Sequence, residues 1–429
     1  MVAPAMSPPD PAPRSYPPFV SLHRRSARGA ASAPAATDFA ALEAWLLGDA
    51  AREEDLLTFF EALVWRLVAA GVPLDRASLH VGTLHPQLYG FAWNWNRSDG
   101  LCDEVRVAEQ ALQADAYRRN PLFGVIERGE SFRGRTDDPA TAARYPLMAE
   151  LARQGIVEYL ALPLRSGGSY HNAATAATRQ ADGFGEATLA GLQRVLRLFA
   201  LHVERHIARR IAVNVLDTYL GAAAGGRVLD GRIKRGAGER ISAVVWASDL
   251  RGFTDLSEKL DGPDMIALLN VYFEIMAGAV LEQGGEVLKF IGDGLLAVFP
   301  FAGFGDEAAA ARAAVAAAEQ ALARLARLNA GPPPELAAAA TWLPLATGIA
   351  LHEGDVFFGN VGAPGRLDFT VIGRAVNAAS RVEALTKALG RPILITADVA
   401  RRLDRPLEAL GPHALRGAAA PVELFALAG

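Results

Sequence analysis

Two aspartates in the C-terminal half have the residue type and the setting of a metal-binding pair. Asp249 follows an apolar strand expected at 241–246, and Asp293 lies at the tip of a hairpin between strands expected at 286–290 and 295–299. The first strand and the central hairpin of a βαββαβ sheet are neighbours, so the two carboxylates can converge. Mg²⁺ prefers oxygen ligands, commonly one or two carboxylates together with substrate phosphates. Taken singly, Asp249 also fits a helix N-cap, and Asp293 fits a tight Asp-Gly hairpin turn.

The turn that follows Asp249 has the character of an anion site. Gly252 permits a close backbone approach, and Gly252, Phe253 and Thr254 stand at the start of an expected helix. Backbone N–H groups at such a place can bind a triphosphate.

The hydrophobic pattern predicts the elements that position these residues. An amphipathic helix at 265–281, an alanine-rich helix at 307–329 and strands at 346–352 and 356–359 follow the first strand and hairpin. The order is then β-α-β-β-α-β, which is typical of a ferredoxin-like core. We therefore expect a mixed α/β (α+β) fold with this core in the C-terminal half.

Three motifs of this half resemble the signatures of class III nucleotidyl cyclases. They are residues 248–254 (SDLRGFT), 289–294 (KFIGDG) and 369–381 (FTVIGRAVNAASR), in the family's order. The resemblance implies a cyclase catalytic domain over 232–429. Its reaction would turn a nucleoside triphosphate into a cyclic nucleotide and pyrophosphate, which makes the implied enzyme a phosphorus-oxygen lyase.

Roles for single residues follow from this resemblance. Asp249 and Asp293, with the Leu250 carbonyl, would bind two Mg²⁺ or Mn²⁺ ions per active site. Asn377 would orient the ribose, and Arg381 would donate to the phosphoryl oxygens as negative charge builds up on them. A permanently charged, fork-shaped guanidinium suits that role.

Lys289 and Thr370 indicate the base that is bound. Adenine presents an acceptor at N1 and a donor at N6, which Lys289 Nζ and Thr370 Oγ1 can match. A lysine facing guanine N1–H would oppose donor to donor, at a cost of about 1–3 kcal/mol. Adenine-specific members of the family carry a lysine with an aspartate or threonine at these places. We therefore expect an adenylate cyclase acting on ATP, with a guanylate cyclase and a non-catalytic nucleotide-binding sensor as the alternatives.

The resemblance also implies a partner. In this family the metal aspartates come from one subunit, and the base-reading pair, the asparagine and the arginine come from the other. All six are present in this chain. A head-to-tail homodimer with two equivalent sites at its interface is therefore expected. Arg416 takes a place where the family has a basic residue near the β- and γ-phosphates, although a surface salt bridge fits it equally well.

The N-terminal half is interpreted as a regulatory region. Residues 1–37 are rich in proline and alanine and are expected to form a disordered tail. Residues 38–185 weakly resemble GAF-type sensor domains and would bind an unidentified small-molecule ligand. Trp93 and Trp95 fit core packing better than such a pocket. Residues 186–231 are expected to form a helical dimerisation linker and hinge, because apolar residues keep a 3-4 spacing and then shift phase; one amphipathic helix packed on its own domain is the alternative.

Composition excludes other classes of function. The 429-residue chain has a net charge of −4, so it lacks the basic field of a nucleic-acid-binding protein. Its single cysteine, Cys102, can form neither an intramolecular disulfide nor a cysteine zinc site. No run of 18 apolar residues predicts membrane insertion, and we expect a cytoplasmic protein. Only four of the 43 basic residues are lysines, so a lysine in a polar motif, such as Lys289, indicates a chemical requirement.

Overall fold

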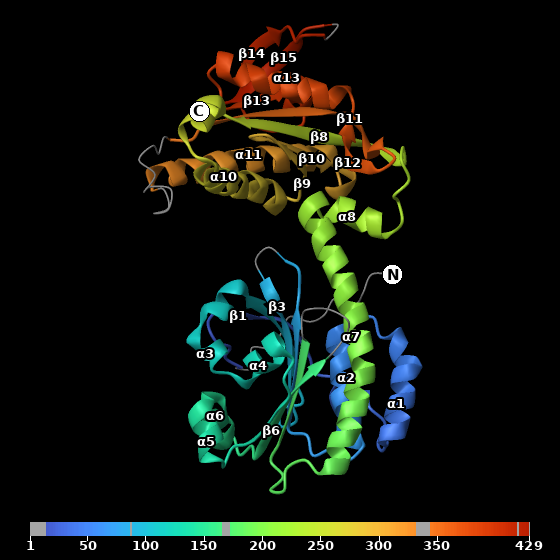
Figure 1. The fold of residues 1–429 in the computed structure, drawn as a ribbon. Helices are drawn as coiled ribbons and strands as arrows, with labels where there is room; N and C mark the ends of the chain where they lie inside the picture. The colour runs from blue at the N-terminus through green and yellow to red at the C-terminus, as the bar shows by residue number, and fades with distance from the viewer. Residues whose placement is uncertain (1–13, 86–87, 165–171, 332–343, 418–419, 429) are drawn as a thin grey trace. The chain divides into compact units, whose positions relative to one another are not determined.

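The computed structural model describes residues 14–85, 88–164, 172–331, 344–417 and 420–428. It divides into two compact units, Met1–Val215 and Leu216–Gly429, each of which is described by itself (Figure 1). The division falls inside helix α7, Glu186–Leu220. This helix lies within the segment 186–231 that the sequence predicts as a helical linker.

A seven-stranded sheet forms the centre of the N-terminal unit. Its strands are β1 (Val20–Ser26), β2 (Arg76–Gly82), β3 (Leu88–Asn96), β4 (Cys102–Ala108), β5 (Phe132–Arg135), β6 (Glu158–Leu164) and β7 (Asn172–Thr178). They lie in the order β1-β4-β3-β2-β7-β6-β5, and all neighbours are antiparallel. The unit is thus an antiparallel sheet with helices on its faces.

Helices cover both faces of this sheet. They are α1 (Phe39–Leu47), α2 (Leu56–Ala69), α3 (Asp115–Arg118), α4 (Pro121–Arg128), α5 (Pro139–Arg144) and α6 (Pro146–Arg153), together with the first part of α7. Figure 1 shows α1, α2 and α7 on one face and α3 to α6 on the other. Asp38 and Asp55 begin α1 and α2 by accepting hydrogen bonds from the backbone N–H groups of Ala41 and Thr58. Trp93 and Trp95 are each 1% exposed and belong to the core under α2 and α7.

The prediction of a disordered tail over residues 1–37 is wrong for residues 14–37. Val20–Ser26 forms β1 and pairs with β4 along its length. Arg24 binds Glu104, and Arg25 Nε donates to Asp103 Oδ1 at 2.6 Å; both carboxylates are fully buried. These ion pairs join residues about 80 positions apart in the chain. Local composition could not reveal them, and residues 1–13 lie outside the described part.

The sheet of the C-terminal unit holds the residues of the expected site. Its strands are β8 (Gly238–Leu250), β9 (Glu286–Ile291), β10 (Gly294–Pro300), β11 (Thr347–Ala363), β12 (Arg366–Ile372), β13 (Ile393–Thr396), β14 (Leu407–His413) and β15 (Val422–Leu427). They lie in the order β14-β15-β13-β11-β8-β10-β9, with β12 paired to β11. The two strands expected at 346–352 and 356–359 are one strand, because pairing with β8 continues without a break from Thr347 to Gly359.

Helices again cover both faces of the sheet. They are α8 (Ala222–Leu229), α9 (Phe253–Lys259), α10 (Gly262–Glu282), α11 (Glu307–Ala330), α13 (Arg374–Ala388) and α14 (Ala397–Ala400). Side chains alternate along β8: Val244 and Trp246 pack with α10 and α11, whereas Val245 and Ala247 pack with α8 and α13. The central elements follow as β8-α10-β9-β10-α11-β11, which confirms the predicted order β-α-β-β-α-β.

Two helices of this unit bear on the sequence predictions. Part of the segment 186–231, expected to be a hinge, is the ordered helix α8, whose Ala224 is buried in the core. Among the helices of the described residues, α10 alone has the length and apolar composition that could cross a membrane. Its Tyr272 and Met276 are fully buried in the core against the sheet.

Candidate active site

Asp249 and Asp293 converge at one end of β8. Asp249 is the second-to-last residue of β8, and Asp293 lies in the turn between β9 and β10, where Gly292 has a φ of 63°. Since β10 pairs with β8 up to Ser248, this turn brings Asp293 beside Asp249. Burial and the Asp249 carboxylate raise the pKa of Asp293 to about 6. Burial is the larger cause, and the contribution of Asp249 reflects two like charges that lie near each other.

The end of β8 is held firmly enough to maintain this repulsion. The Thr347 hydroxyl donates to the Asp249 carbonyl at 2.8 Å, and the Tyr272 hydroxyl lies 2.8 Å from the same Thr347 oxygen. Gly294 follows Asp293 where the backbone is closely packed, because a Cβ at that position would stand 3.1 Å from the Ser248 carbonyl oxygen and 3.2 Å from that of Ile291. Asp249 is therefore positioned by β8, and Asp293 by the tight turn that joins the paired strands β9 and β10.

The donor set of this pair suits a divalent cation of the Mg²⁺ type. Two carboxylate groups supply hard oxygen ligands, and a bound cation would remove the repulsion that raises the pKa of Asp293. Within the described residues, no group of three or more His, Cys, Asp or Glu side chains forms a metal site. Further ligands would then be backbone carbonyls such as that of Leu250, water and substrate oxygens.

The turn after β8 leaves backbone donors free at the start of α9. Gly252 has a φ of 72°, a conformation that favours glycine, and no side chain caps the helix there. The N–H groups of Phe253 and Thr254 lie in the first turn of α9, where intrahelical partners are lacking. Gly252 and Thr254 are exposed. This geometry is compatible with the predicted role of the turn in anion binding.

Lys289 contacts β12, the strand that carries Thr370, but its partner there is a different residue. Lys289 Nζ donates to Asp368 Oδ2 at 2.6 Å. Asp368 and Thr370 are two positions apart in β12, so their side chains share a face. The Thr370 hydroxyl is buried and has no hydrogen-bond partner in the described part of the chain. The sequence analysis missed Asp368, and its acidic type two positions before Thr370 was the available signal.

Asn377 and Arg381 lie together on the exposed side of α13. They are four residues apart and therefore occupy the same side of the helix. The Arg381 guanidinium lies beside Gly417, where a Cβ would stand 3.5 Å from Nη2. Because Arg416 precedes Gly417 and is exposed, the two arginines belong to one basic region of the surface.

One chain does not bring Arg381 to the aspartates. The side of α13 that faces them carries Glu383, whose pKa is raised to about 7 by burial and by Asp249. Glu383 follows Arg381 by two residues, which places the two side chains on nearly opposite sides of the helix. Among the described residues, no hydrogen bond or ion pair joins Asn377 or Arg381 to Asp249 or Asp293.

The structure adds Glu383 to the residues near the site. Arg251 Nη1 lies 3.9 Å from Glu383 Oε1, so the arginine after Leu250 has a structural partner. The sequence analysis did not single out Glu383. Its helical phase relative to Arg381 was the available signal, but the phase has no meaning until the side of α13 that meets the sheet is known.

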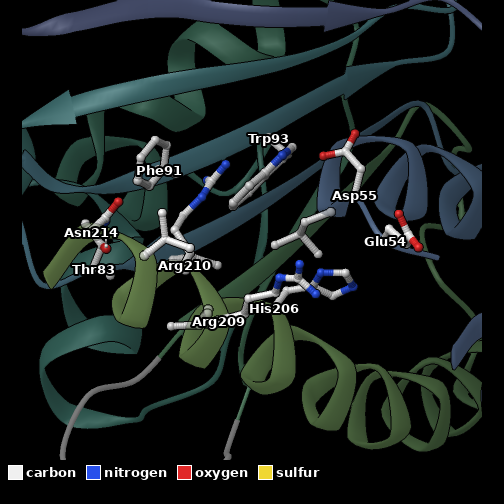
Figure 2. Close-up of a pocket in the computed structure, with 14 residues that line it drawn as sticks. Glu54, Asp55, Thr83, Phe91, Trp93, His206, Arg209, Arg210 and Asn214 are labelled. Atoms are coloured by element: carbon white, nitrogen blue, oxygen red, sulfur yellow. Dashed lines mark hydrogen bonds between the residues drawn. The ribbon is translucent and has the colours of Figure 1, made fainter. Parts of the chain in front are cut away.

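The N-terminal unit has a pocket of about 240 Å³ beside α7. Figure 2 shows Arg210 of α7 lying next to Phe91 and Trp93 in this pocket. The Arg210 guanidinium lies 4.1 Å from the centre of the Phe91 ring, and its Nη2 donates to Glu104 Oε1 at 2.8 Å. Since the pocket is small for an organic ligand and Arg210 is already paired, we regard it as part of the anchoring of α7 to its sheet.

Known proteins match the C-terminal part of the chain. Residues 239–429 match the family model described as adenylate and guanylate cyclase catalytic domain. An adenylate cyclase of Anabaena cylindrica is 38% identical over 175 residues, covering 41% of this chain and 33% of the relative. Photoactivated adenylate cyclase subunit alpha of Euglena gracilis is 33% identical over 171 residues, covering 40% of this chain and 16% of the relative. The crystal structure of the adenylyl cyclase CyaB from P. aeruginosa aligns with a TM-score of 0.41 and 30% sequence identity, over 45% of this chain and 96% of that chain.

The matches cover the C-terminal part of this chain and only part of each curated relative. The chain spans only 33% and 16% of the length of the two curated relatives. The family match, in contrast, contains all three motifs and every site residue predicted from the sequence. Residues 239–429 therefore carry a catalytic domain of the class III adenylate and guanylate cyclase family.

Proposed function

We propose that this chain is an adenylate cyclase, which converts ATP into 3′,5′-cyclic AMP and pyrophosphate. The observation that carries the proposal is the convergence of Asp249 and Asp293, with the pKa of Asp293 raised to about 6 by burial and by Asp249. A hairpin turn has no structural need for a second carboxylate against its aspartate, since the repulsion only costs stability. The family match over residues 239–429 supports the assignment of this pair to catalysis.

The residues around the pair have separate roles in this reaction. Two Mg²⁺ or Mn²⁺ ions bound by Asp249, Asp293 and the Leu250 carbonyl would neutralise charge on the ribose 3′-oxygen and on the triphosphate. The 3′-oxygen bonds to the α-phosphorus and loses its proton, while the bond to the bridging oxygen breaks and pyrophosphate leaves. Backbone N–H groups at Gly252, Phe253 and Thr254 would hold the triphosphate at the start of α9.

Adenine specificity is the part of the proposal that depends on β9 and β12. Lys289 would donate to adenine N1 and Thr370 would accept from N6. The Thr370 hydroxyl lacks a partner among the described residues, so a ligand donor would satisfy it. Asp368, which binds Lys289 at 2.6 Å, would act as a positioning residue for the ammonium group.

We also propose that the active site is completed by a second copy of the chain. Asn377 and Arg381 are exposed, and α13 turns Glu383 rather than Arg381 toward the aspartates. In a head-to-tail dimer, Asn377 of one copy would orient the ribose bound at the aspartates of the other, and Arg381 would stabilise charge on the phosphoryl oxygens. Arg416, which shares the surface of Arg381, would contact the β- and γ-phosphates.

The two-unit organisation supports a regulated enzyme. The neighbour order β11-β8-β10-β9 supports a ferredoxin-like catalytic core. The antiparallel sheet of the N-terminal unit, with helices on both faces, supports a GAF-like sensor that acts on the catalytic unit. We also propose a cytoplasmic location for the protein.

The proposal is tested with the purified full-length chain, Mn²⁺ and either ATP or GTP. Cyclic AMP should form from ATP, and Asp249→Ala and Arg381→Ala should each be inactive, whereas Asp404→Ala, at an exposed acidic position away from the site, should remain active. More cyclic GMP than cyclic AMP would assign a guanylate cyclase. Full activity of Asp249→Ala would contradict the catalytic role of the aspartate pair, and no cyclic product from either nucleotide would leave a nucleotide-binding sensor.

Mixing the two inactive variants tests the shared site. After subunit exchange, about half of the dimers should be mixed, and each mixed dimer has one intact site, so about a quarter of the parental activity should return. No recovery in a mixture shown to have exchanged subunits would contradict the shared site.

A further inference from the structure

The N-terminal unit has a second, larger cavity on the face of its sheet opposite α7. Its volume is about 650 Å³, within the range of about 300–1,000 Å³ that is typical of small-molecule sites. Even-numbered residues of β2 and β3 make up most of the floor, whereas the odd-numbered Leu79, Trp93 and Trp95 face the core under α2 and α7. The cavity and the pocket beside α7 share only the lining residues Val81, Gly82 and Phe91.

Strand register determines which polar and apolar residues lie side by side on the floor. Residues directly opposite one another in antiparallel strands share a face. The four rows, from one end to the other, are Arg76–Asn96, Ser78–Asn94–Asp103, His80–Ala92–Val105 and Gly82–Gly90–Val107. Successive rows lie about 7 Å apart. One end of the floor is thus polar and the other apolar, which matches a ligand with a polar group and an apolar body.

Small and apolar residues keep the second end open. A Cβ on Gly90 would collide with the Val81 carbonyl, so this position excludes any larger residue. Val105 and Val107 of β4 line the cavity, and so do Leu122 and Ile126 of α4, a helix that packs on β6 and β7. These four side chains are the apolar part of the lining.

Arg76 provides an unpaired charge at the polar end. Its Nη1 donates to Gln154 Oε1 at 2.8 Å, and it forms no ion pair in the described part of the chain. Burial, together with the neighbouring Arg14 and Arg179, lowers the pKa of Arg76, whereas Tyr159 and Glu150 act in the opposite direction. The neighbouring Arg14, in contrast, is paired with Asp99. Arg76 is half-buried, and a carboxylate is the ligand group that would pair with its guanidinium through two parallel hydrogen bonds.

The floor also carries the Asp103 carboxylate, which is already ion-paired with Arg25, and the acidic Glu150 lines the cavity. The other polar groups of the floor are neutral. Burial lowers the pKa of His80 to about 4, and its Nε2 lies 2.8 Å from Ser78 Oγ, so the imidazole is uncharged at neutral pH. The side-chain amides of Asn94 and Asn96 have no hydrogen-bond partner among the described residues. Arg76 is therefore the cation of the floor, with two amides beside it.

We propose that this cavity binds a small organic acid, with its carboxylate on Arg76 and Asn96 and its apolar body against the lining residues Ala92, Val105, Leu122 and Ile126. The inference deepens the sensing role proposed above. Its test measures binding and requires no cyclase activity, so failure of one proposal is distinguishable from failure of the other.

The test is calorimetric titration of the full-length chain with hexanoate, octanoate, decanoate, phenylacetate and indole-3-acetate, each compared with its primary amide. At least one acid should bind with a stoichiometry of one per chain, at least about tenfold tighter than its amide. Arg76→Gln should weaken that acid by about tenfold or more and leave the amide unchanged. Arg179→Gln is the matched control, because Arg179 pairs with Asp75 outside the cavity. Val107→Trp fills the apolar end and should weaken both acid and amide.

Three results would overturn the proposal. They are no binding of any of these acids to the parent chain, equal affinity for acid and amide, and unchanged acid affinity in Arg76→Gln. The comparison of acid with amide is made on the parent chain, so it decides the question even if a variant fails to fold.

Discussion

Replacing Asp249 by asparagine should stabilise the metal-free protein while it abolishes catalysis. The reason is the pKa of Asp293, which burial and the neighbouring Asp249 carboxylate raise to about 6 from the ordinary value of 3.8. Asp249→Asn removes the repelling charge and keeps the size and shape of the side chain. A residue held for metal binding rather than for folding is expected to behave in this way.

The magnitude follows from the pKa of Asp293. One pKa unit corresponds to about 1.4 kcal/mol, so ionised Asp293 is penalised by at most about 3 kcal/mol. Burial causes the larger share of this penalty, and Asp293 keeps contact with solvent, which screens the repulsion by Asp249. We therefore expect Asp249→Asn to add about 1 kcal/mol to the local free energy of unfolding.

The gain should depend on pH with a definite sign. Below about pH 4 the Asp293 carboxyl is protonated in both the folded and the unfolded chain, and the charge of Asp249 has little effect on it. As pH rises through the range from about 4 to about 6, the unfolded chain ionises first, so the parent loses stability. The difference between variant and parent should therefore appear across this range and stay constant above it.

Amide hydrogen exchange of β8 measures this local stability. In chelator, at about pH 7, β8 should exchange more slowly in Asp249→Asn than in the parent, and added Mn²⁺ should protect only the parent. Asp404→Asn, at an exposed acidic position, serves as the control. Equal or faster exchange of β8 in Asp249→Asn across this pH range would refute the electrostatic reasoning.

Three further predictions concern single side chains. Lys289→Arg should lower the rate of cyclic AMP formation although the charge is kept, because a broad guanidinium cannot replace a compact ammonium at adenine N1. The control is Lys387→Arg, at an exposed position of α13, which should keep the parental rate. Full activity of Lys289→Arg would contradict the prediction. Glu104→Gln should lower the free energy of unfolding of the N-terminal unit by about 3 kcal/mol, because the buried carboxylate binds both Arg24 and Arg210; urea denaturation should show a loss below about 1 kcal/mol for Glu43→Gln, which removes a more exposed pair with Arg194. Burial lowers the pKa of His80 to about 4, so the unfolded chain takes up the proton first as pH falls. The free energy of unfolding of the N-terminal unit should therefore drop by up to about 3 kcal/mol between about pH 6.5 and about pH 4. His80→Gln should remove this pH dependence, and an unchanged profile in the variant would contradict the burial of a neutral imidazole.

Local patterns predicted the elements of the catalytic unit well. The strands expected at 286–290 and 295–299 are confirmed as β9 and β10, and the helix expected at 265–281 is confirmed within α10. Alternation in strands, the 3-4 spacing of the helix and the Gly292-Asp293 turn are all carried by neighbouring residues. Such signals survive in the folded state because the sheet buries the faces that they mark.

Local patterns failed to predict the structure of residues 14–37, because these residues are stabilised by pairing with distant segments of the chain. The basic residues at 23–25 indicate a solvated tail by composition, yet Arg25 is buried against Asp103. The stabilising partner lies in β4, and nothing in the local sequence identifies it. Part of the segment expected to be a hinge is likewise the helix α8, which the core of the catalytic unit stabilises through Ala224.

The sequence by itself determined the residue types of the candidate site, the order of the elements that carry them and the family of residues 239–429. The tertiary structure decided which of these residues meet. Only the register of β10 on β8 places Asp293 against Asp249, and only the packing of α13 turns Glu383 toward the aspartates and Arg381 away from them. The pairing of β2, β3 and β4 likewise decides that Arg76 and Val107 line opposite ends of one cavity. Helical and strand periods are local properties of a chain, whereas register and helix phase are set by contacts between segments that are far apart in the sequence.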